Sequence, residues 1–206
     1  MNRLIIIGAG GHGKVIADIA LKNGYEEISF VDDNAEGSCL GFPIIGTVER
    51  LEELNDGSTD FVIAVGDNAV RRKIAESHAV GWTKLIHPSA QIGFGAKIGA
   101  GTVVMAGAVI NPDARIGRHC IINSCSVIEH DNRLGDFIHV SPNAALSGTV
   151  TVGDNTHIGI GAAVRNNITI GENTVIGAGA VVVKNISGGG TYIGIPAKKK
   201  EELADR

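Results

Sequence analysis

The sequence is poor in aromatic residues and rich in glycine. Its 206 residues include five Phe, two Tyr and one Trp against 29 Gly. A core built mainly on large aromatic side chains is therefore excluded, and small and aliphatic side chains must pack between many tight turns. Cysteine is also scarce: Cys39, Cys120 and Cys125 are odd in number and lack paired metal spacing. We interpret them as free structural thiols rather than redox or metal groups.

Long apolar runs and long runs of one charge are absent as well. The large-aliphatic run Leu4–Ile7 is far too short for the core of a signal peptide, and no later segment approaches the length of a membrane span. The net charge is only −4, so neither nucleic acid nor a membrane is an expected partner. We expect a soluble, cytoplasmic protein.

The first part of the chain, residues 1–84, alternates between predicted strands and helices. We predict strands over residues 3–8, 27–31 and 60–65, and helices over residues 14–23, 48–54 and 68–78. This alternation is typical of a Rossmann-like α/β domain with a parallel sheet. Ligands bind such sheets in a crevice at the carboxyl ends of the strands.

A glycine motif follows the first strand. Gly8, Gly10 and Gly13 have the spacing of the dinucleotide fingerprint, and Asp32 follows the second strand. The domain has room for only one mononucleotide-binding half, whereas a full dinucleotide site needs two. Three interpretations of the motif stay open: a nucleotide-linked ligand, a full NAD site, or a purely structural turn. Within the motif, His12 either donates a hydrogen bond to phosphate or sugar, or points into water.

From residue 86 the sequence repeats with a period of six. Every sixth residue is aliphatic, seventeen times without interruption. These residues are Ile86, Ile92, Ile98, Val104, Ile110, Ile116, Ile122, Ile128, Leu134, Val140, Leu146, Val152, Ile158, Val164, Ile170, Ile176 and Val182. An α-helix, with about 3.6 residues per turn, would scatter this repeat around its circumference. Units this short must instead stack on one another to bury the aliphatic side chain.

The repeat predicts a solenoid of short strands in which each hexad forms one side of a coil and its aliphatic side chain points inward. It resembles the hexapeptide repeat of the left-handed parallel β-helix acyltransferases. That resemblance implies the left-handedness, three hexads per triangular coil and a homotrimer. We expect the β-helix over residues 85–195 and a C-terminal tail over 196–206, in which Lys198–Lys200 either neutralise CoA phosphates or are solvated.

Two histidines stand out within the repeat. His130 is two residues after the inward Ile128, whereas His139 is five residues after the inward Leu134. The two histidines therefore occupy different positions within the hexad, and both side chains face outward or lie at a corner. Carboxylates flank His130 on both sides, and a carboxylate can orient an imidazole and raise its basicity. His157 is eighteen residues after His139 and should lie one coil above it. We interpret His119 and His157 as solvated surface residues.

Longer motifs make the resemblance more specific. The chain combines the strand–GxGGHG–helix start with Ser126-Val-Ile-Glu-His-Asp131, Phe137-Ile-His-Val-Ser141 and Ile193-Gly-Ile-Pro-Ala-Lys198. In this order it resembles the sugar acyltransferases grouped with sialic acid O-acetyltransferases. Within them it is most similar to enzymes that N-acetylate UDP-linked 4-amino-4,6-dideoxy sugars in bacterial glycan synthesis of the bacillosamine type.

The resemblance also implies roles for individual residues. His130 matches the general base, and Asp131 matches the adjacent acid, which is often glutamate in similar sequences. His139 matches a contact to the thioester end of acetyl-CoA. The positions that match the CoA groove of a neighbouring subunit are Gly148, Ile160 and Ala178. The positions that match the nucleotide-sugar pocket are Gly10, Gly11, His12, Asp32, Asp33 and Gly66.

Three functions are compatible with the sequence. The first is an acetyl-CoA-dependent acetyltransferase that acts on a UDP-linked 4-amino sugar, with intersubunit active sites and His130 as general base. The second is O-acetylation of a sialic-acid-like or other sugar hydroxyl. The third is a non-catalytic, nucleotide-binding module that the β-helix assembles into a trimer. We expect no metal, because the histidines form no ligand cluster in the sequence.

Overall fold

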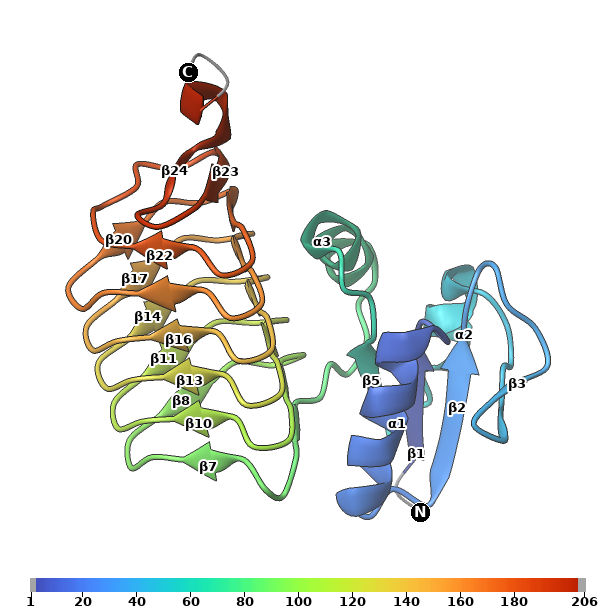
Figure 1. The fold of residues 1–206 in the computed structure, drawn as a ribbon. Coiled ribbons are helices and arrows are strands. Elements are labelled where there is room, and N and C mark those ends of the chain that lie inside the picture. Colours follow the sequence, from blue (N-terminus) through green and yellow to red (C-terminus); the bar gives the residue numbers. More distant parts are fainter. Residues whose placement is uncertain (1–2, 204–206) are drawn as a thin grey trace.

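The computed structural model describes residues 3–203 of the chain and consists of an α/β domain beside a tall solenoid of short strands (Figure 1). The predicted fold class, an α/β domain followed by a parallel β-helix, is confirmed. None of the helices in the described part of the chain has the length and apolarity needed to cross a bilayer.

The α/β domain contains a three-stranded parallel sheet in the order β2-β1-β5. Its strands are β1 (Arg3–Ile7), β2 (Glu27–Val31) and β5 (Asp60–Ile63), and its helices are α1 (Gly11–Lys22), α2 (Leu51–Leu54) and α3 (Asn68–Ser77). A turn of 3-10 helix, Val48–Arg50, precedes α2, and the short strands β3 (Ser38–Cys39) and β4 (Phe42–Pro43) form an additional antiparallel pair. All the predicted strands and helices are present, whereas the β3–β4 pair was not predicted.

The two faces of this sheet are covered separately. Leu4 and Ile6 pack on the side of α1, and Ile5 and Ile7 pack on the side of α2 and α3. Every residue of β1 from Leu4 onward is buried, as predicted for a central strand with an unbroken aliphatic sequence.

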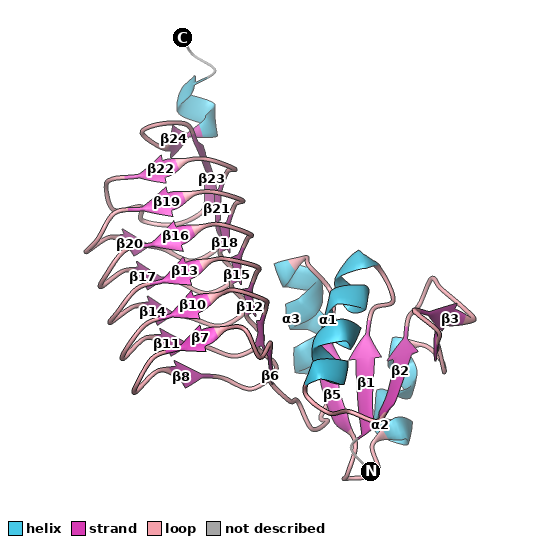
Figure 2. Cartoon of the chain, turned by 60° about the horizontal axis from the view of Figure 1, so that its bottom comes forward, coloured by secondary structure: helices cyan, strands magenta, loops and turns pink. Residues whose placement is uncertain are grey.

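The solenoid has three sides, each a sheet that we name after its first strand (Figure 2), and their strands are parallel except for the terminal strand β24. The β6 sheet contains β6 (Leu85–Ile86), β9 (Val103–Val104), β12 (Ile121–Ile122), β15 (His139–Val140), β18 (His157–Ile158), β21 (Thr174–Ile176), β23 (Gly190–Ile193) and β24 (Lys198–Lys199). The β7 sheet contains β7 (Gln91–Ile92), β10 (Val109–Ile110), β13 (Val127–Ile128), β16 (Ala145–Leu146), β19 (Ala163–Val164) and β22 (Val181–Val182). The β8 sheet contains β8 (Lys97–Ile98), β11 (Arg115–Ile116), β14 (Arg133–Leu134), β17 (Thr151–Val152) and β20 (Thr169–Ile170).

Strands stack with a shift of eighteen residues, so each coil contains three hexads. Ile110, for example, pairs with Ile92 on one side and with Ile128 on the other. The aliphatic residues of the repeat form one continuous core along the solenoid. Ile92 is the exception, because β7 is the terminal strand of its sheet and leaves this side chain 40% exposed.

The far end of the solenoid is closed by an irregular hairpin. Strand β24 pairs antiparallel with β23, through Tyr192 with Lys199 and Ile193 with Lys198, and a 3-10 helix, Lys200–Leu203, follows. Both lysines of β24 are half-buried. Lys198 and Lys199 are therefore part of the sheet at the end of the solenoid, whereas Lys200 is exposed.

The α/β domain packs against the β6 sheet (Figure 2). Side chains of α1, including Ile16, share a core with Leu85, Val103 and Ile121 of that sheet. The corner between the β7 and β8 sheets, which we call the β7/β8 vertex, is opposite the β6 sheet in the triangular cross-section. The two domains are thus joined by a continuous apolar interface, and the β7/β8 vertex remains free of the α/β domain.

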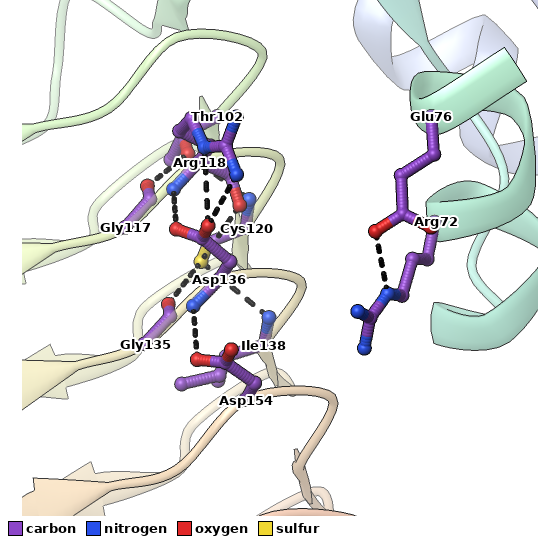
Figure 3. Close-up of polar contacts among 10 residues, drawn as sticks. All are labelled: Arg72, Glu76, Thr102, Gly117, Arg118, Cys120, Gly135, Asp136, Ile138 and Asp154. Atoms are coloured by element: carbon purple, nitrogen blue, oxygen red, sulfur yellow. Dashed lines mark hydrogen bonds and ion pairs between the residues drawn. The ribbon is translucent and has the colours of Figure 1, made fainter.

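A ladder of polar groups runs along the corner between the β8 and β6 sheets (Figure 3). The Asp136 carboxylate accepts hydrogen bonds from the backbone N–H of Arg118, at 2.7 Å, and from its guanidinium, at 2.8 and 3.0 Å. The Asp154 carboxylate in turn accepts from the backbone N–H of Asp136 at 2.9 Å. These residues are eighteen apart, so each carboxylate caps the turn one coil earlier.

Candidate functional site

His130 lies at the β7/β8 vertex, in the turn between β13 and β14. Its Nδ1 is 2.8 Å from Oδ2 of Asp131, and both side chains are 58% exposed. The hydrogen bond to the carboxylate raises the pKa of His130 above its ordinary value. With Nδ1–H donated to Asp131, the Nε2 lone pair faces away and is available to accept a proton. The shorter side chain of Asp131, compared with glutamate, still reaches the imidazole.

Gly148 lies directly above His130, one coil further on. The two turns are joined by a hydrogen bond of 3.0 Å from Thr149 N to His130 O. A Cβ atom at position 148 would be 2.6 Å from both Cε1 and Nε2 of the imidazole. Glycine at this position therefore leaves the space that the His130 ring occupies.

Ile160 and Ala178, which the sequence grouped with Gly148, lie elsewhere. They occupy successive turns of the corner between the β6 and β7 sheets, where Gly179 N donates to Ile160 O at 2.8 Å. Both side chains are exposed, and that of Ile160 is 53% exposed. Within one chain the structure therefore brings Gly148 to His130 but separates it from the other two predicted CoA-groove residues.

His139 and His157 lie on the β6 sheet, on the side of the α/β domain. They are paired in register on β15 and β18, as predicted, and their rings stack at 4.7 Å with an interplanar angle of 2°. His157 lines a cavity of about 230 Å³ together with Gly66 and Asn68, and its Nε2 is 2.7 Å from Ser141 Oγ. The interpretation of His157 as a solvated surface residue is wrong, because the α/β domain covers this part of the sheet.

Arg71, on α3, joins the two domains and was not singled out from the sequence. Its side chain is 1% exposed. The guanidinium donates to the carbonyl oxygens of His119 (2.7 Å) and Phe137 (3.1 Å) in the solenoid, and to those of Val65 (3.0 Å) and Gly66 (3.2 Å) in the α/β domain. None of these partners carries a negative charge, and burial lowers the pKa of Arg71 to about 10.

His119 is buried next to Arg71. Its ring packs edge-on against Trp82 at 5.1 Å and stacks on Phe137 at 5.3 Å. The prediction of a solvated residue is wrong here too, because the turn that contains His119 faces the α/β domain. Burial, followed by the charges of Arg118 and Arg71, lowers the pKa of His119 to about 4.

The remaining histidines near this interface are also held neutral. Burial, and then the neighbouring His157 and Arg71, lower the pKa of His139 to about 3. The pKa of His157 is lowered by burial and by Arg71. His12 is half-buried, and burial together with Arg71 lowers its pKa to about 4. Its Nε2 is buried without a hydrogen-bond partner among the described residues, so the alternative in which His12 points into water is wrong.

Three glycines of the predicted nucleotide pocket are not explained by packing within the chain. A Cβ atom at Gly10, Gly11 or Gly66 would meet nothing within 4 Å, and none of the three has a positive φ. Gly13, by contrast, is in close contact with the backbone of the residue that follows β1, since its Cβ would be 2.1 Å from Gly8 O. The open space beside the first three glycines is where a ligand can approach the backbone.

Asp32 and Asp33 lie at the carboxyl end of β2, as predicted. Asp32 accepts hydrogen bonds from the backbone N–H groups of Ala9 (2.7 Å) and Asn34 (2.8 Å), so it is tied to the glycine loop. Asp33 accepts from Val48 N at 2.9 Å. Both carboxylates line a cavity of about 510 Å³, and a second cavity of about 220 Å³ extends from them to Gly8. The predicted pocket residues are thus gathered along one edge of the sheet.

The candidate site therefore consists of two parts that do not meet within one chain. One part is the exposed His130–Asp131 pair below Gly148, and the other is the sheet edge with its glycines, acids and interface histidines. The first can accept a proton, and the second offers backbone and polar groups to a phosphorylated ligand. Among residues 3–203 no group of three or more His, Cys, Asp or Glu side chains could hold a metal ion.

Two protein families match the chain. Residues 3–78 match the PglD N-terminal domain, and residues 95–130 and 149–184 match the bacterial transferase hexapeptide with six repeats. A UDP-N-acetylbacillosamine N-acetyltransferase from Bacillus subtilis (strain 168) is 42% identical over 113 residues, which span 52% of this chain and 52% of that enzyme. The matched stretch thus covers about half the length of this curated relative.

Solved structures match nearly the whole chain. The acetyltransferase domain of PglB from Neisseria gonorrhoeae FA1090 has a TM-score of 0.94 and 43% identity, covering 97% of this chain and 100% of that one. The same domain has been solved in complex with acetyl coenzyme A. A mutant of perosamine N-acetyltransferase from Caulobacter crescentus, in complex with CoA and GDP-perosamine, has a TM-score of 0.92 and 38% identity, covering 97% of each chain.

Proposed function

Because the chain belongs to the hexapeptide-repeat sugar acyltransferases that carry a PglD N-terminal domain, we propose that it is an acetyl-CoA-dependent N-acetyltransferase. Its proposed acceptor is the 4-amino group of a UDP-linked 4-amino-4,6-dideoxy sugar. Two relatives named as N-acetyltransferases of amino sugars support the reaction. The Bacillus enzyme, which is named for a UDP-linked sugar, supports the nucleotide.

The observation that carries this proposal is the His130–Asp131 pair, in which Nδ1 is held by the carboxylate at 2.8 Å and Nε2 bonds to none of the residues that the structure describes. In the proposed reaction the amine attacks the thioester carbonyl while Nε2 takes the proton that the amine loses. A C–N bond forms, the C–S bond breaks, and CoA leaves as its thiol after it receives a proton. A positioned general base of this kind contributes about 10²–10⁴ in rate. Asp131 keeps the imidazole in the tautomer that can accept the proton.

We further propose that the active site forms between subunits of a homotrimer. The β7/β8 vertex of one chain, with His130 and Gly148, would meet the sheet edge and β6 sheet of its neighbour. His139 would then contact the thioester end of acetyl-CoA, and Ile160 and Ala178 would line the CoA groove. The separation of His130 from the nucleotide pocket within one chain supports this arrangement, because both substrates must converge on one imidazole.

The nucleotide sugar is assigned to the edge of the α/β sheet. The open space at Gly10, Gly11 and Gly66 allows a diphosphate to approach backbone N–H groups near the start of α1. The Nε2 of His12 is buried and has no partner within the part of the chain that the structure describes, and as a neutral imidazole His12 can bond to the sugar or the phosphate. In this proposal Asp32 and Asp33 would accept hydrogen bonds from ribose or base. Proximity of the two bound substrates supplies much of the rate enhancement.

The test is thiol release on mixing the protein with acetyl-CoA and a UDP-linked 4-amino sugar. We expect His130→Ala to lower kcat by about 10²–10⁴, whereas His87→Ala, a change in the first coil, should leave it unaltered. Parallel reactions with a GDP-linked amino sugar and with a hydroxyl sugar identify the nucleotide and the acceptor atom. Release with only the hydroxyl sugar would favour the O-acetyltransferase, and NAD binding without transfer would favour a non-catalytic module.

A further inference from the structure

One buried side chain beneath the His130 turn differs from its counterparts in the other hexads. Four residues after each inward aliphatic, the chain places a side chain under the turn that follows. From residue 96 to 180 these side chains are Ala96, Thr102, Ala108, Ala114, Cys120, Ser126, Asn132, Ile138, Ala144, Val150, Thr156, Ala162, Ile168, Thr174 and Ala180. All are apolar or carry a single hydroxyl or thiol, except Asn132. The Asn132 side chain is 0% exposed.

The hydroxyl and thiol side chains at this position make one of two kinds of hydrogen bond. Thr102 Oγ1 donates to the carbonyl of Gly117, fifteen residues later on the next coil, at 2.8 Å, and Cys120 Sγ makes the equivalent bond at 3.2 Å (Figure 3). Ser126 Oγ donates instead to the carbonyl three residues earlier, in its own turn, at 2.7 Å. A hydroxyl or thiol carries only one hydrogen, so it cannot make both bonds fully at once.

Asn132 makes both. Its Nδ2 carries two hydrogens and donates to Glu129 O, three residues earlier, at 2.6 Å and to Ser147 O, fifteen residues later, at 3.0 Å. Glu129 directly precedes His130, and Ser147 directly precedes Gly148. The amide therefore ties together the two stacked turns that hold the imidazole and the glycine that makes room for it.

This amide is not the choice that stability alone would favour. Asn132 Oδ1 is buried without a hydrogen-bond partner among the described residues, and an unsatisfied buried acceptor is destabilising. The same position elsewhere in the solenoid is occupied by alanine or threonine without this defect. The unsatisfied Asn132 oxygen is found at the turn that carries His130. There the spacing between the His130 ring and Gly148 is tight, since a Cβ at position 148 would be 2.6 Å from the imidazole.

We propose that Asn132 is a positioning residue that fixes the spacing of the His130 and Gly148 turns and so aims Nε2 of His130 at the acceptor amine. The inference rests on the proposed function, because it assigns Asn132 to the site of that reaction. Asn132 acts through the backbone and touches neither substrate. Loss of the amide lets the two turns move apart and loosens the geometry of the His130–Asp131 pair.

The test compares Asn132→Ala, Asn132→Thr and Thr102→Ala. Thr102→Ala is the matched control. It removes a side-chain hydrogen bond to the carbonyl fifteen residues later, from the same position in the hexad, but at a corner that does not contain His130. We expect Asn132→Ala to lower kcat about ten- to a hundredfold, with little change in either KM. Asn132→Thr, which keeps one donor, should lie between Asn132→Ala and the wild type. Thr102→Ala should keep the wild-type kcat.

A second readout does not depend on acetyl transfer. Titration of the His130 imidazole by NMR should show its pKa falling toward the ordinary value in Asn132→Ala, because the bond to Asp131 loosens, and remaining unchanged in Thr102→Ala. If the protein transfers no acetyl group, the proposed function fails and this titration alone decides the role of Asn132. An unaltered His130 titration in Asn132→Ala, or equal losses of kcat in Asn132→Ala and Thr102→Ala, would overturn the inference. Should Asn132→Ala not fold, Asn132→Thr carries both readouts.

Discussion

The β7/β8 vertex and the interface between the two domains both contain histidine, in opposite environments. At the vertex, His130 is exposed beside a carboxylate that raises its pKa. At the interface, burial lowers the pKa values of His12, His119 and His139 to between about 3 and about 4, and the charge of the buried Arg71 contributes to each shift.

This difference shows how one residue type serves two purposes. A general base must be accessible to the substrate, and its protonated form must be stabilised. At the β7/β8 vertex, Asp131 stabilises the protonated form of His130. A residue that holds two domains together, or that donates to a ligand as a neutral imidazole, must not acquire a charge in a buried place. Arg71 already places one buried positive charge there, and it disfavours a second.

The largest expected effect is at the vertex. In Gly148→Ala the new Cβ would be 2.6 Å from the imidazole, so the His130 ring has to move, and we expect kcat to fall about a hundredfold. Backbone strain is not the cause, because φ at Gly148 is not positive. In the His130→Ala background the same substitution should cost little further activity, because the colliding ring is gone. Additive losses in the double mutant would contradict this explanation.

The next effect concerns the interface, and it is on stability. The pKa of His119 is near 6.5 in the unfolded chain and about 4 in the folded one. Between these values the unfolded state binds more protons, so the free energy of unfolding must decrease as the pH falls from 6.5 towards 4. For His119 we expect a loss of about 2 kcal/mol.

Urea unfolding at several pH values measures this loss. His119→Phe keeps an aromatic ring against Trp82 and Phe137 but cannot bind a proton. Its free energy of unfolding should therefore depend less on pH than that of the wild type. An equally steep decrease in the variant would show that His119 does not contribute to acid sensitivity.

The smallest effect is expected from the carboxylates around His130. Asp131→Asn weakens the hydrogen bond and removes the charge that together raise the pKa of the imidazole. The acid limb of the pH profile of kcat/KM should therefore move to lower pH. With a less basic and less well oriented imidazole, kcat should fall about tenfold at neutral pH. Glu129→Gln is the control, because that carboxylate accepts from the backbone N–H of His130, at 3.4 Å, and its charge is the smallest cause of the raised pKa of the imidazole. Equal shifts in both variants would mean that general charge, and not the bond to Asp131, sets the basicity of His130.

Much of the fold could be predicted from local pattern. The period of six required stacked short strands, and alternation of strands and helices required a parallel sheet, because each pattern has only one way to bury its aliphatic residues. The carboxylates that flank His130 predicted a contact between its imidazole and a carboxylate, and the resemblance implied that Asp131 makes it, in agreement with the bond of 2.8 Å. Position along the repeat predicted the alignment of His139 with His157.

Packing between the domains could not be predicted in this way. His119 and His157 are exposed on an isolated solenoid, and only the α/β domain buries them. Arg71 is a polar residue in an ordinary amphipathic helix, and nothing in its neighbours indicates that four carbonyl oxygens, two from each domain, surround it. The two hydrogen bonds of Asn132 could not be predicted either, since its second partner, Ser147, is fifteen residues away.

The sequence by itself determined the two domain types, the inward aliphatic columns and the pairing of His130 with Asp131, because each depends on residues close together or on a strict period. The tertiary structure alone decided which sheet of the solenoid faces the α/β domain. That choice determines which histidines are buried around Arg71 and which one remains accessible. It depends on the complementarity of two apolar surfaces that no local pattern specifies.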